Sequence, residues 1–279
     1  GLSVGSLTVT IVDDNGCTED VPVTITEPAD LTGAITAQTN VDCNGNTTGS
    51  VTVAADVGTG TAPYLYSTDG GATTQASGTF SGLSVGSLTV TIVDDNGCTE
   101  DVPVTITEPN SIFANGVVTD NLCWDQVNAT ITQSVTGGSG PGTYSFSWIF
   151  NGSAITDITE NLINLDSGSY TVTIIDSESC TYDTTYVIST PAEIIVNGVP
   201  TNVDCNGAST GSIDITPSSG ATPYTYDWDH LPPGGYVDIE DPTLLPLGSY
   251  TVSVMDGNGC VMDSTIEITE NSVITGVTS

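Results

Sequence analysis

The sequence predicts an all-β protein built from β-sandwich domains in tandem, and three observations lead to this fold class. Related sequence blocks recur every 80–82 residues along the 279-residue chain. Within each block, short stretches alternate apolar and polar residues as β-strands do, and no stretch keeps the 3.6-residue period of a helix. The 31 glycines and 14 prolines supply turns between these stretches.

The repeat defines the predicted domains. Residues 1–28 recur letter for letter at 82–109, and a tripeptide of the T-E-P type closes each block, beginning at Thr26, Thr107, Ser189 and Thr269. We therefore predict domains at 29–109, 110–191 and 192–270. Residues 1–28 correspond to the C-terminal part of a truncated repeat, and 271–279 to the start of a further repeat or a linker. We expect the chain to be a segment of a longer array.

The first complete repeat shows the strand pattern most clearly, because Leu88, Val90 and Ile92 alternate with threonines. Its predicted strands are 31–39, 50–55, 64–68, a weak pair within 72–83, 87–94 and 102–107. Seven strands in about 80 residues are typical of an immunoglobulin-like Greek-key sandwich. The predicted fold class is therefore all-β, with seven-strand immunoglobulin-like sandwiches in an extended tandem array.

Aromatic residues alternate along one strand of each repeat, as in PYTYDW at 223–228. Tyr224, Tyr226 and Trp228 share one strand face, so we expect them to pack in the core. Tyr170 and Tyr250 open the penultimate strand, where such sandwiches place a tyrosine whose hydroxyl bonds to nearby backbone. The alternative, a platform for stacking sugars, requires these rings to be exposed.

The charge balance excludes several functions. The chain has no Lys or Arg and 34 Asp or Glu residues, so its formal net charge is −34. Nucleic-acid binding by counterion release and docking on anionic lipid both need basic residues, and we expect neither partner. No apolar run is long enough for a membrane-spanning helix in this segment.

Three ordered motifs resemble the SprB repeat. They are the C-x-G stretches VDCNGNTTGSVTV at 41–53 and VDCNGASTGSIDI at 203–215, then P-Y-x-Y, then G-S-[LY]-T-V ending in G-C before T-E-P. The middle repeat departs from the pattern, because Trp124 and Asp125 follow Cys123 and Ser179 replaces the glycine of the G-C pair.

The resemblance implies very large cell-surface adhesins of gliding Bacteroidota, exported by the type IX secretion system and displayed as long extracellular filaments. It implies that the chain is a structural or adhesive segment of such a filament, used for surface attachment during gliding motility. The partners implied are neighbouring repeats of the same chain, like filaments or surface polysaccharide.

Two other functional classes compete with this one. The alternative function is a carbohydrate-binding β-sandwich module of a secreted or matrix protein. An enzyme has the least support: no catalytic residues are assigned, because the single histidine, His230, has no partner motif.

The seven cysteines fall two to a repeat with one in the truncated unit, and an extracellular location favours disulfides. They are Cys17, Cys43, Cys98, Cys123, Cys180, Cys205 and Cys260. Their pairing stays open between two schemes. Modular domains commonly form their disulfides internally, which slightly favours pairing within a repeat. That scheme gives Cys43–Cys98, Cys123–Cys180 and Cys205–Cys260. In strict seven-strand topology the two cysteines lie at opposite ends, which favours Cys43–Cys180 and Cys123–Cys260 between neighbours.

Acidic turns and modification motifs complete the candidate sites. Tight-turn chemistry explains the DDNG and DGNG stretches, but their carboxylates also make structural Ca²⁺ a candidate, although no cofactor is required. The candidate metal ligands are Asp13, Asp14, Asp42, Asp94, Asp95 and Asp256. Thr184 and Ser264 lie in D-[TS]-T stretches that resemble the O-glycosylation motif of Bacteroidota.

Overall fold

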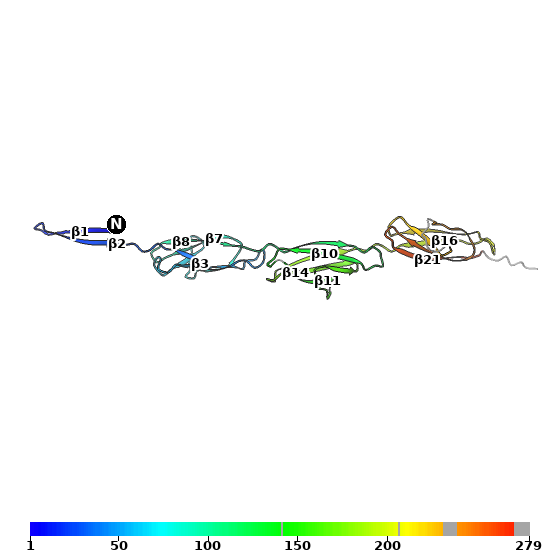
Figure 1. Cartoon of the computed structure of the whole chain (residues 1–279), viewed down its shortest axis with the longest axis horizontal. Helices are drawn as coiled ribbons and strands as arrows, with labels where there is room; N and C mark the ends of the chain where they lie inside the picture. Colours follow the sequence, from blue (N-terminus) through cyan, green and yellow to red (C-terminus); the bar gives the residue numbers. More distant parts are fainter. Residues whose placement is uncertain (141, 206, 231–238, 271–279) are drawn as a thin grey trace, which may run out of the picture. The chain divides into compact units, whose positions relative to one another are not determined.

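The computed structural model describes residues 1–140, 142–205, 207–230 and 239–270, and all its regular secondary structure is β-strand. None of these residues forms a helix long and apolar enough to cross a membrane. The predicted start of a further repeat at 271–279 lies outside the described residues. Every sheet takes its strands from a single predicted repeat (Figure 1).

The first repeat, 29–109, is a sandwich of two antiparallel three-stranded sheets. One has the order β3 (Gly33–Thr39), β4 (Gly49–Ala55), β6 (Thr79–Leu83), and the other β5 (Leu65–Ser67), β7 (Gly86–Val93), β8 (Thr99–Ile106). The chain crosses between the sheets after β4, after β5 and after β6, which gives the connections of an immunoglobulin-like fold. The predicted weak pair within 72–83 is one strand, β6, preceded by an isolated bridge from Gln75 to Tyr66.

The other two repeats have the same sheet order. The second pairs β9 (Phe113–Thr119), β10 (Ala129–Thr136) and β13 (Leu162–Leu165) in one sheet, and β12 (Ser153–Ala154), β11 (Ser145–Phe150), β14 (Gly168–Ile175) and β15 (Thr181–Ile188) in the other. The third pairs β16 (Ile195–Thr201), β17 (Gly211–Ser218) and β19 (Thr243–Leu245), and then β18 (Thr225–Trp228), β20 (Gly248–Met255) and β21 (Val261–Ile268). The predicted all-β fold of tandem immunoglobulin-like sandwiches is confirmed. The second repeat has the predicted seven strands, whereas the first has six, because its predicted weak pair is a single strand.

The aromatic strand residues lie in the cores, as predicted. Trp148 and Trp228 are almost fully buried, and each indole N–H donates to a backbone carbonyl, that of Thr159 or Ile239. Tyr226 is buried beside Trp228 and Tyr224 packs against the same cluster. These rings therefore serve packing and do not form an exposed platform.

The predicted tyrosines at the start of the penultimate strand also behave as expected. The Tyr170 hydroxyl donates to the carbonyl of Asp166 at 3.2 Å, and the Tyr250 hydroxyl donates to the carbonyl of Pro246 at 2.9 Å. Each bond ties the start of β14 or β20 to the chain four residues upstream, as in other sandwiches of this class.

Residues 1–28 form a hairpin of β1 (Gly5–Val12) and β2 (Thr18–Ile25), with the same register as β7 and β8, which have the identical sequence. The environments differ. Val9 and Ile11 are 45% and 58% exposed, whereas their copies Val90 and Ile92 are fully buried under the β3–β4–β6 sheet. The hairpin therefore carries an apolar face without the second sheet that covers its copy.

The chain divides into two compact units that do not coincide with the predicted repeats. The first contains Gly1–Ile112 with Thr136–Thr143 and Asp176–Cys180, and the second contains Phe113–Val135, Tyr144–Ile175 and Thr181–Ser279. Two loops of the second repeat thus belong with the first repeat. The predicted repeat boundaries remain a prediction, and the reason for this exchange lies in the loops described next.

Candidate functional site

The turn between the last two strands of each repeat, here called the closing turn, is organised by one buried aspartate. In the first repeat, Asp94 Oδ1 accepts the N–H groups of Asn96 and Cys98, and Oδ2 accepts the N–H of Thr61 from another loop. Asp176 and Asp256 make the same three kinds of bond in the other repeats. The carboxylate therefore fixes the backbone of the cysteine that follows it by four residues.

The environment of Asp94 and Asp256 sets the pKa of their carboxyls. Burial by itself raises the pKa of the Asp94 and Asp256 carboxyls, but the backbone N–H donors lower it, and each pKa lies below the usual 3.8. Because the chain has no Lys or Arg, backbone donors supply the stabilisation that a basic side chain gives elsewhere. Asp94 and Asp256 are therefore charged structural elements of their turns at neutral pH.

The loop that carries the C-x-G motif, here called the opening loop, lies against the end of the same repeat. Gly45 has φ +80°, a conformation that favours glycine, and its N–H donates to the carboxylate of Glu108 in the T-E-P motif at 2.7 Å. The Val41 N–H donates to the carbonyl of Thr107 at 3.0 Å. In the second repeat, the Thr190 hydroxyl donates to the carbonyl of Cys123. The C-x-G and T-E-P motifs therefore meet.

Two disulfides join the opening loop of one repeat to the closing turn of the next. Cys43 is bonded to Cys180 and Cys123 to Cys260, with Cα–Cα distances of 5.5 and 5.4 Å. At the first junction, the Ser139 hydroxyl also donates to the carbonyl of Asp42 at 3.1 Å. At the second, Cys123 is buried within the apolar core cluster of the third repeat. Each junction is therefore a covalent and packed contact.

The slight preference for pairing within a repeat was wrong, and strand geometry gives the reason. The opening loop lies beside Thr107, just after β8 ends, whereas Cys98 immediately precedes β8. Eight residues of extended strand span roughly 25 Å, while disulfide Cα atoms lie within about 7 Å. Cys43 and Cys98 therefore sit at opposite ends of one sandwich, and only a neighbouring repeat brings a partner.

The remaining cysteines, Cys17, Cys98 and Cys205, are exposed free thiols in this structure. Cys17 and Cys98 lie in closing turns. Cys205 lies in an opening loop, where its carbonyl accepts the N–H of the residue three positions later, as the carbonyls of Cys43 and Cys123 do. Within this chain, the expected disulfides therefore form at four of the seven cysteines.

The candidate calcium ligands do not gather into a site. Among the described residues, no group of three or more His, Cys, Asp or Glu side chains is placed to hold a metal ion. Asp13, Asp42, Asp94 and Asp256 instead accept hydrogen bonds from their own turns. Asp14 and Asp95 are exposed. Turn chemistry, the simpler explanation, accounts for the acidic motifs.

The two modification candidates occupy equivalent strand positions. Thr184 in β15 lies opposite Val172, and Ser264 in β21 lies opposite Val252. Both side chains are half-buried, with exposed neighbours at Asp183 and Asp263. Their glycosylation stays a prediction.

We predict that disulfide mapping will find Cys43–Cys180 and Cys123–Cys260. Cleavage before aspartate separates all seven cysteines, although the peptides of Cys17 and Cys98 share one sequence, DNGCTE. After alkylation of the native protein, mass spectrometry should find that sequence and the Cys205 peptide alkylated. A peptide linking Cys43 to DNGCTE would contradict the pairing.

We predict that Asp256→Asn destabilises the third repeat. A carboxamide has one acceptor oxygen where Asp256 uses two, so a backbone N–H loses its partner, at a cost of about 1–3 kcal/mol at pH 7. Because the pKa of Asp256 is lowered by folding, its contribution is present above pH 3.8 and is lost as the pH falls below that value. Chemical denaturation should therefore show a weaker acid dependence in the variant.

The matched control is Asp263→Asn on β21, where one exposed carboxylate oxygen accepts from the Ser253 hydroxyl and the amide keeps that acceptor. It should leave the unfolding free energy nearly unchanged. Equal stability of the Asp256→Asn variant and the parent protein at pH 7 would refute the role of this aspartate.

Comparisons with known proteins give matches among solved structures at low sequence identity. A comparison with curated proteins finds no match. Among solved structures, the N-terminal eight Ig domains of DSCAM match with 13% identity and a TM-score of 0.42, covering 96% of this chain and 43% of that one. Three domains of the bacteriophage RB49 outer capsid protein Hoc match with 13% identity and a TM-score of 0.39, covering 87% and 95%. The fold assignment rests on the sheets described above.

The sequence profile of the SprB repeat matches at residues 35–73 and again at 197–231. These stretches run from the first strand through the C-x-G opening loop and the aromatic strand in the first and third repeats. The chain therefore carries SprB repeats at both places, as its motifs predict.

Proposed function

We propose that this chain is a structural segment of a large extracellular bacterial surface adhesin, in which tandem repeats form a stalk that transmits load to an attachment site. The SprB repeats and the tandem immunoglobulin-like fold support an extracellular adhesive repeat protein. The two disulfides support an oxidising location.

The observation that carries the proposal is the position of the disulfides. Each crosses a junction between repeats, where a stalk under tension would otherwise depend on one peptide linker and weak contacts. Since linker and disulfide run in parallel, tension at a junction is shared between two covalent connections. A protein that only displays independent binding modules gains little from such an arrangement.

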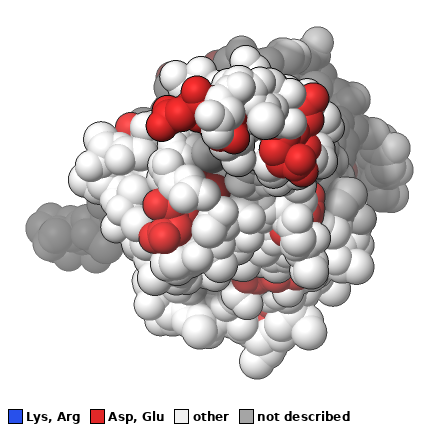
Figure 2. Space-filling model, turned by 90° about the vertical axis from the view of Figure 1, so that its left-hand side faces the viewer, with Lys and Arg blue, Asp and Glu red and all other residues white. Residues whose placement is uncertain are grey.

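The surface chemistry fits the same role. Figure 2 shows acidic side chains on the face it displays, and the chain has no basic residue to neutralise them. Uniform negative charge favours solubility and mutual repulsion of filaments. The absence of Lys and Arg also removes every cleavage site for trypsin-like proteases.

The competing functions receive less support. The aromatic rings that sugar stacking would require at the surface are in the cores, as predicted, and His230 packs edge-on against Trp228 and Tyr250. The proposed function is therefore structural and adhesive, and it includes neither catalysis nor carbohydrate binding by the repeats. Export by the type IX system and use in gliding by a member of the Bacteroidota are further parts of the proposal, and they rest on the family alone.

We predict that antibodies raised against the chain label intact, unpermeabilised cells of the producing bacterium. Trypsin should not cleave within the repeats, whereas a glutamate-directed protease should destroy their epitopes, because the chain has Glu but no Lys or Arg. The oxidised chain should bind no glycan on an array of bacterial and algal polysaccharides.

Labelling that appears only after permeabilisation would contradict the surface location. Saturable binding to a defined glycan would contradict the stalk function and support a carbohydrate-binding module. A cysteine-free variant of the chain on the same array separates binding by the folded repeats from binding by unfolded protein.

A further inference from the structure

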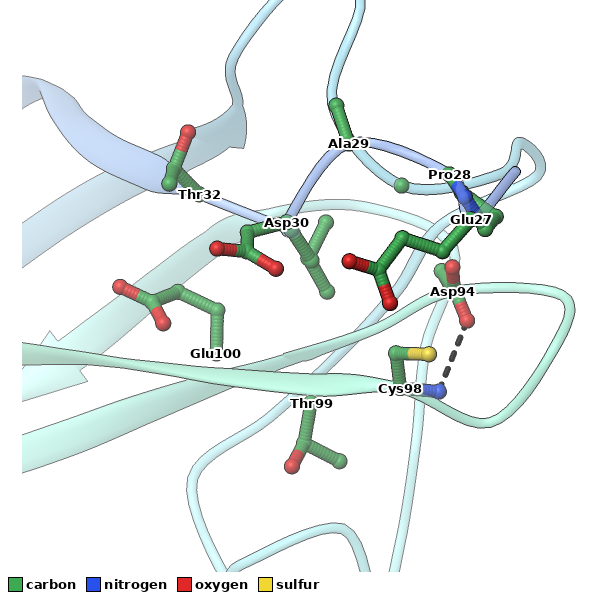
Figure 3. A pocket seen from close by; sticks show the side chains of 11 residues that line it. Glu27, Pro28, Ala29, Asp30, Thr32, Asp94, Cys98, Thr99 and Glu100 are labelled. Carbon is green, nitrogen blue, oxygen red and sulfur yellow. Dashed lines mark hydrogen bonds between the residues drawn. The ribbon is translucent and has the colours of Figure 1, made fainter. Parts of the chain in front are cut away.

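Cys98 lies at the edge of an open pocket of about 560 Å³ (Figure 3). The pocket is formed by the linker before the first repeat and by the closing turn. Glu27, Ala29, Asp30 and Asp94 are among the residues that line it, and Glu27 and Asp94 lie nearest the thiol in Figure 3. The Cys98 N–H is held by Asp94 as in the other closing turns. The turn therefore presents a positioned thiol.

The equivalent place in the other two repeats is occupied. In the second repeat, the Cys180 sulfur is bonded to Cys43, and the opening loop of the first repeat accepts a hydrogen bond from Ser139, the counterpart of Thr61. In the third repeat, Cys260 is bonded to Cys123. Cys180 and Cys260 are buried by these loops, whereas Cys98 is exposed. The Cys98 pocket is thus the open member of a set of three.

The linker beside the pocket carries a second unoccupied contact. Thr26 and Glu27 have the sequence of Thr107 and Glu108, which hold the opening loop of the first repeat through the N–H groups of Val41 and Gly45. Among the described residues, no glycine N–H makes the corresponding bond to Glu27. Its carboxylate is an acceptor for a glycine N–H in a C-x-G loop.

The hairpin of residues 1–28 supplies a third, independent observation. Its exposed Val9 and Ile11 match Val90 and Ile92, which the β3–β4–β6 sheet covers. A segment with the sequence of 29–81 would cover this face, place a C-x-G loop on Glu27 and bring a cysteine to Cys98.

We propose that the Cys98 pocket is a covalent docking site for the opening loop of a preceding repeat, whose sandwich is completed by the hairpin of residues 1–28. The occupant is an Asp-Cys-x-Gly loop, recognised by Glu27 and closed by a disulfide to Cys98. The first and second repeats are then each bonded to both of their neighbours. This inference goes beyond the stalk function and holds for a repeat protein of any role.

The disulfide forms by thiol–disulfide exchange with a low-molecular-weight disulfide such as oxidised glutathione. One thiolate attacks that disulfide and releases one reduced thiol, and the second thiolate then attacks the mixed disulfide and releases the other. The two cysteine thiols lose two protons and two electrons, and the oxidant leaves as two reduced thiols.

The repeat itself provides the test. A second copy of residues 29–81 fused before Gly1 completes a repeat identical to 29–109, because 1–28 and 82–109 have the same sequence. The fusion is made in the full chain with Cys17→Ser, so that the peptide DNGCTE reports Cys98 alone. After oxidation in a glutathione buffer, alkylation and digestion, we expect almost no DNGCTE that carries an alkyl group or glutathione in the fused chain, because Cys98 is bonded to the added copy. In the parent chain, Cys98 should carry one or the other throughout.

Two controls make the result decisive. Replacing the added cysteine by serine should restore DNGCTE that carries an alkyl group or glutathione while Cys43–Cys180 persists, and the Cys205 peptide should carry one of these two groups in every chain. Hydrogen exchange should show the amides of β1 and β2 protected in the fused chain. Alkylation of Cys98 in the fused chain equal to that in the parent, or unprotected β1 and β2 amides, would overturn the proposal.

Discussion

The disulfide between the opening loop of one repeat and the closing turn of the next is the interaction on which the architecture depends. It exists because the two cysteines of a repeat lie at opposite ends of a sandwich about one strand long. Neither can reach the other, and each must find its partner across a junction. The two disulfides interleave in sequence, 43 with 180 and 123 with 260, so the middle repeat is bonded on both sides.

The lack of basic residues shapes how those junctions are built. A chain with 34 carboxylates and no Lys or Arg must use backbone N–H groups and hydroxyls as donors. The buried aspartates of the closing turns do this, and so do exposed pairs across the last two strands, such as Thr173 with Asp183 and Ser253 with Asp263. The aspartate shapes the turn and accepts the N–H of the cysteine. The acidic residues of the closing turns therefore also position the cysteines that form the disulfides.

The fold could be predicted from the sequence because the features that specify the strands lie within short stretches of the chain. Alternation in Leu88–Val93 and the shared face of Tyr226 and Trp228 specify strands and their buried sides, and the structure agrees. The cysteine pairing depends on which end of a sandwich a loop occupies, and strand direction did indicate pairing between neighbours. The prediction nevertheless favoured pairing within a repeat, because modular domains commonly form their disulfides internally, and that preference was wrong.

The role of the closing-turn aspartates was missed for a different reason. In DDNG the first aspartate precedes the accepted amides by two and four residues, a local signal for side-chain capping of a turn. Its third bond, from Thr61 to Asp94, comes from a loop 33 residues away and has no sequence signature. The exposed hairpin makes the same point, since Ile11 and Ile92 share one sequence context and differ only in what covers them.

The covalent link between neighbouring repeats is tested most directly by cutting the peptide between them. Because the chain contains no Lys or Arg, Asn110→Arg at the exposed first linker creates its only trypsin site. After complete cleavage, the account predicts a single species of full mass on a denaturing, non-reducing gel, held by Cys43–Cys180, and two fragments once reductant is added. Separation of the fragments without reductant would contradict it.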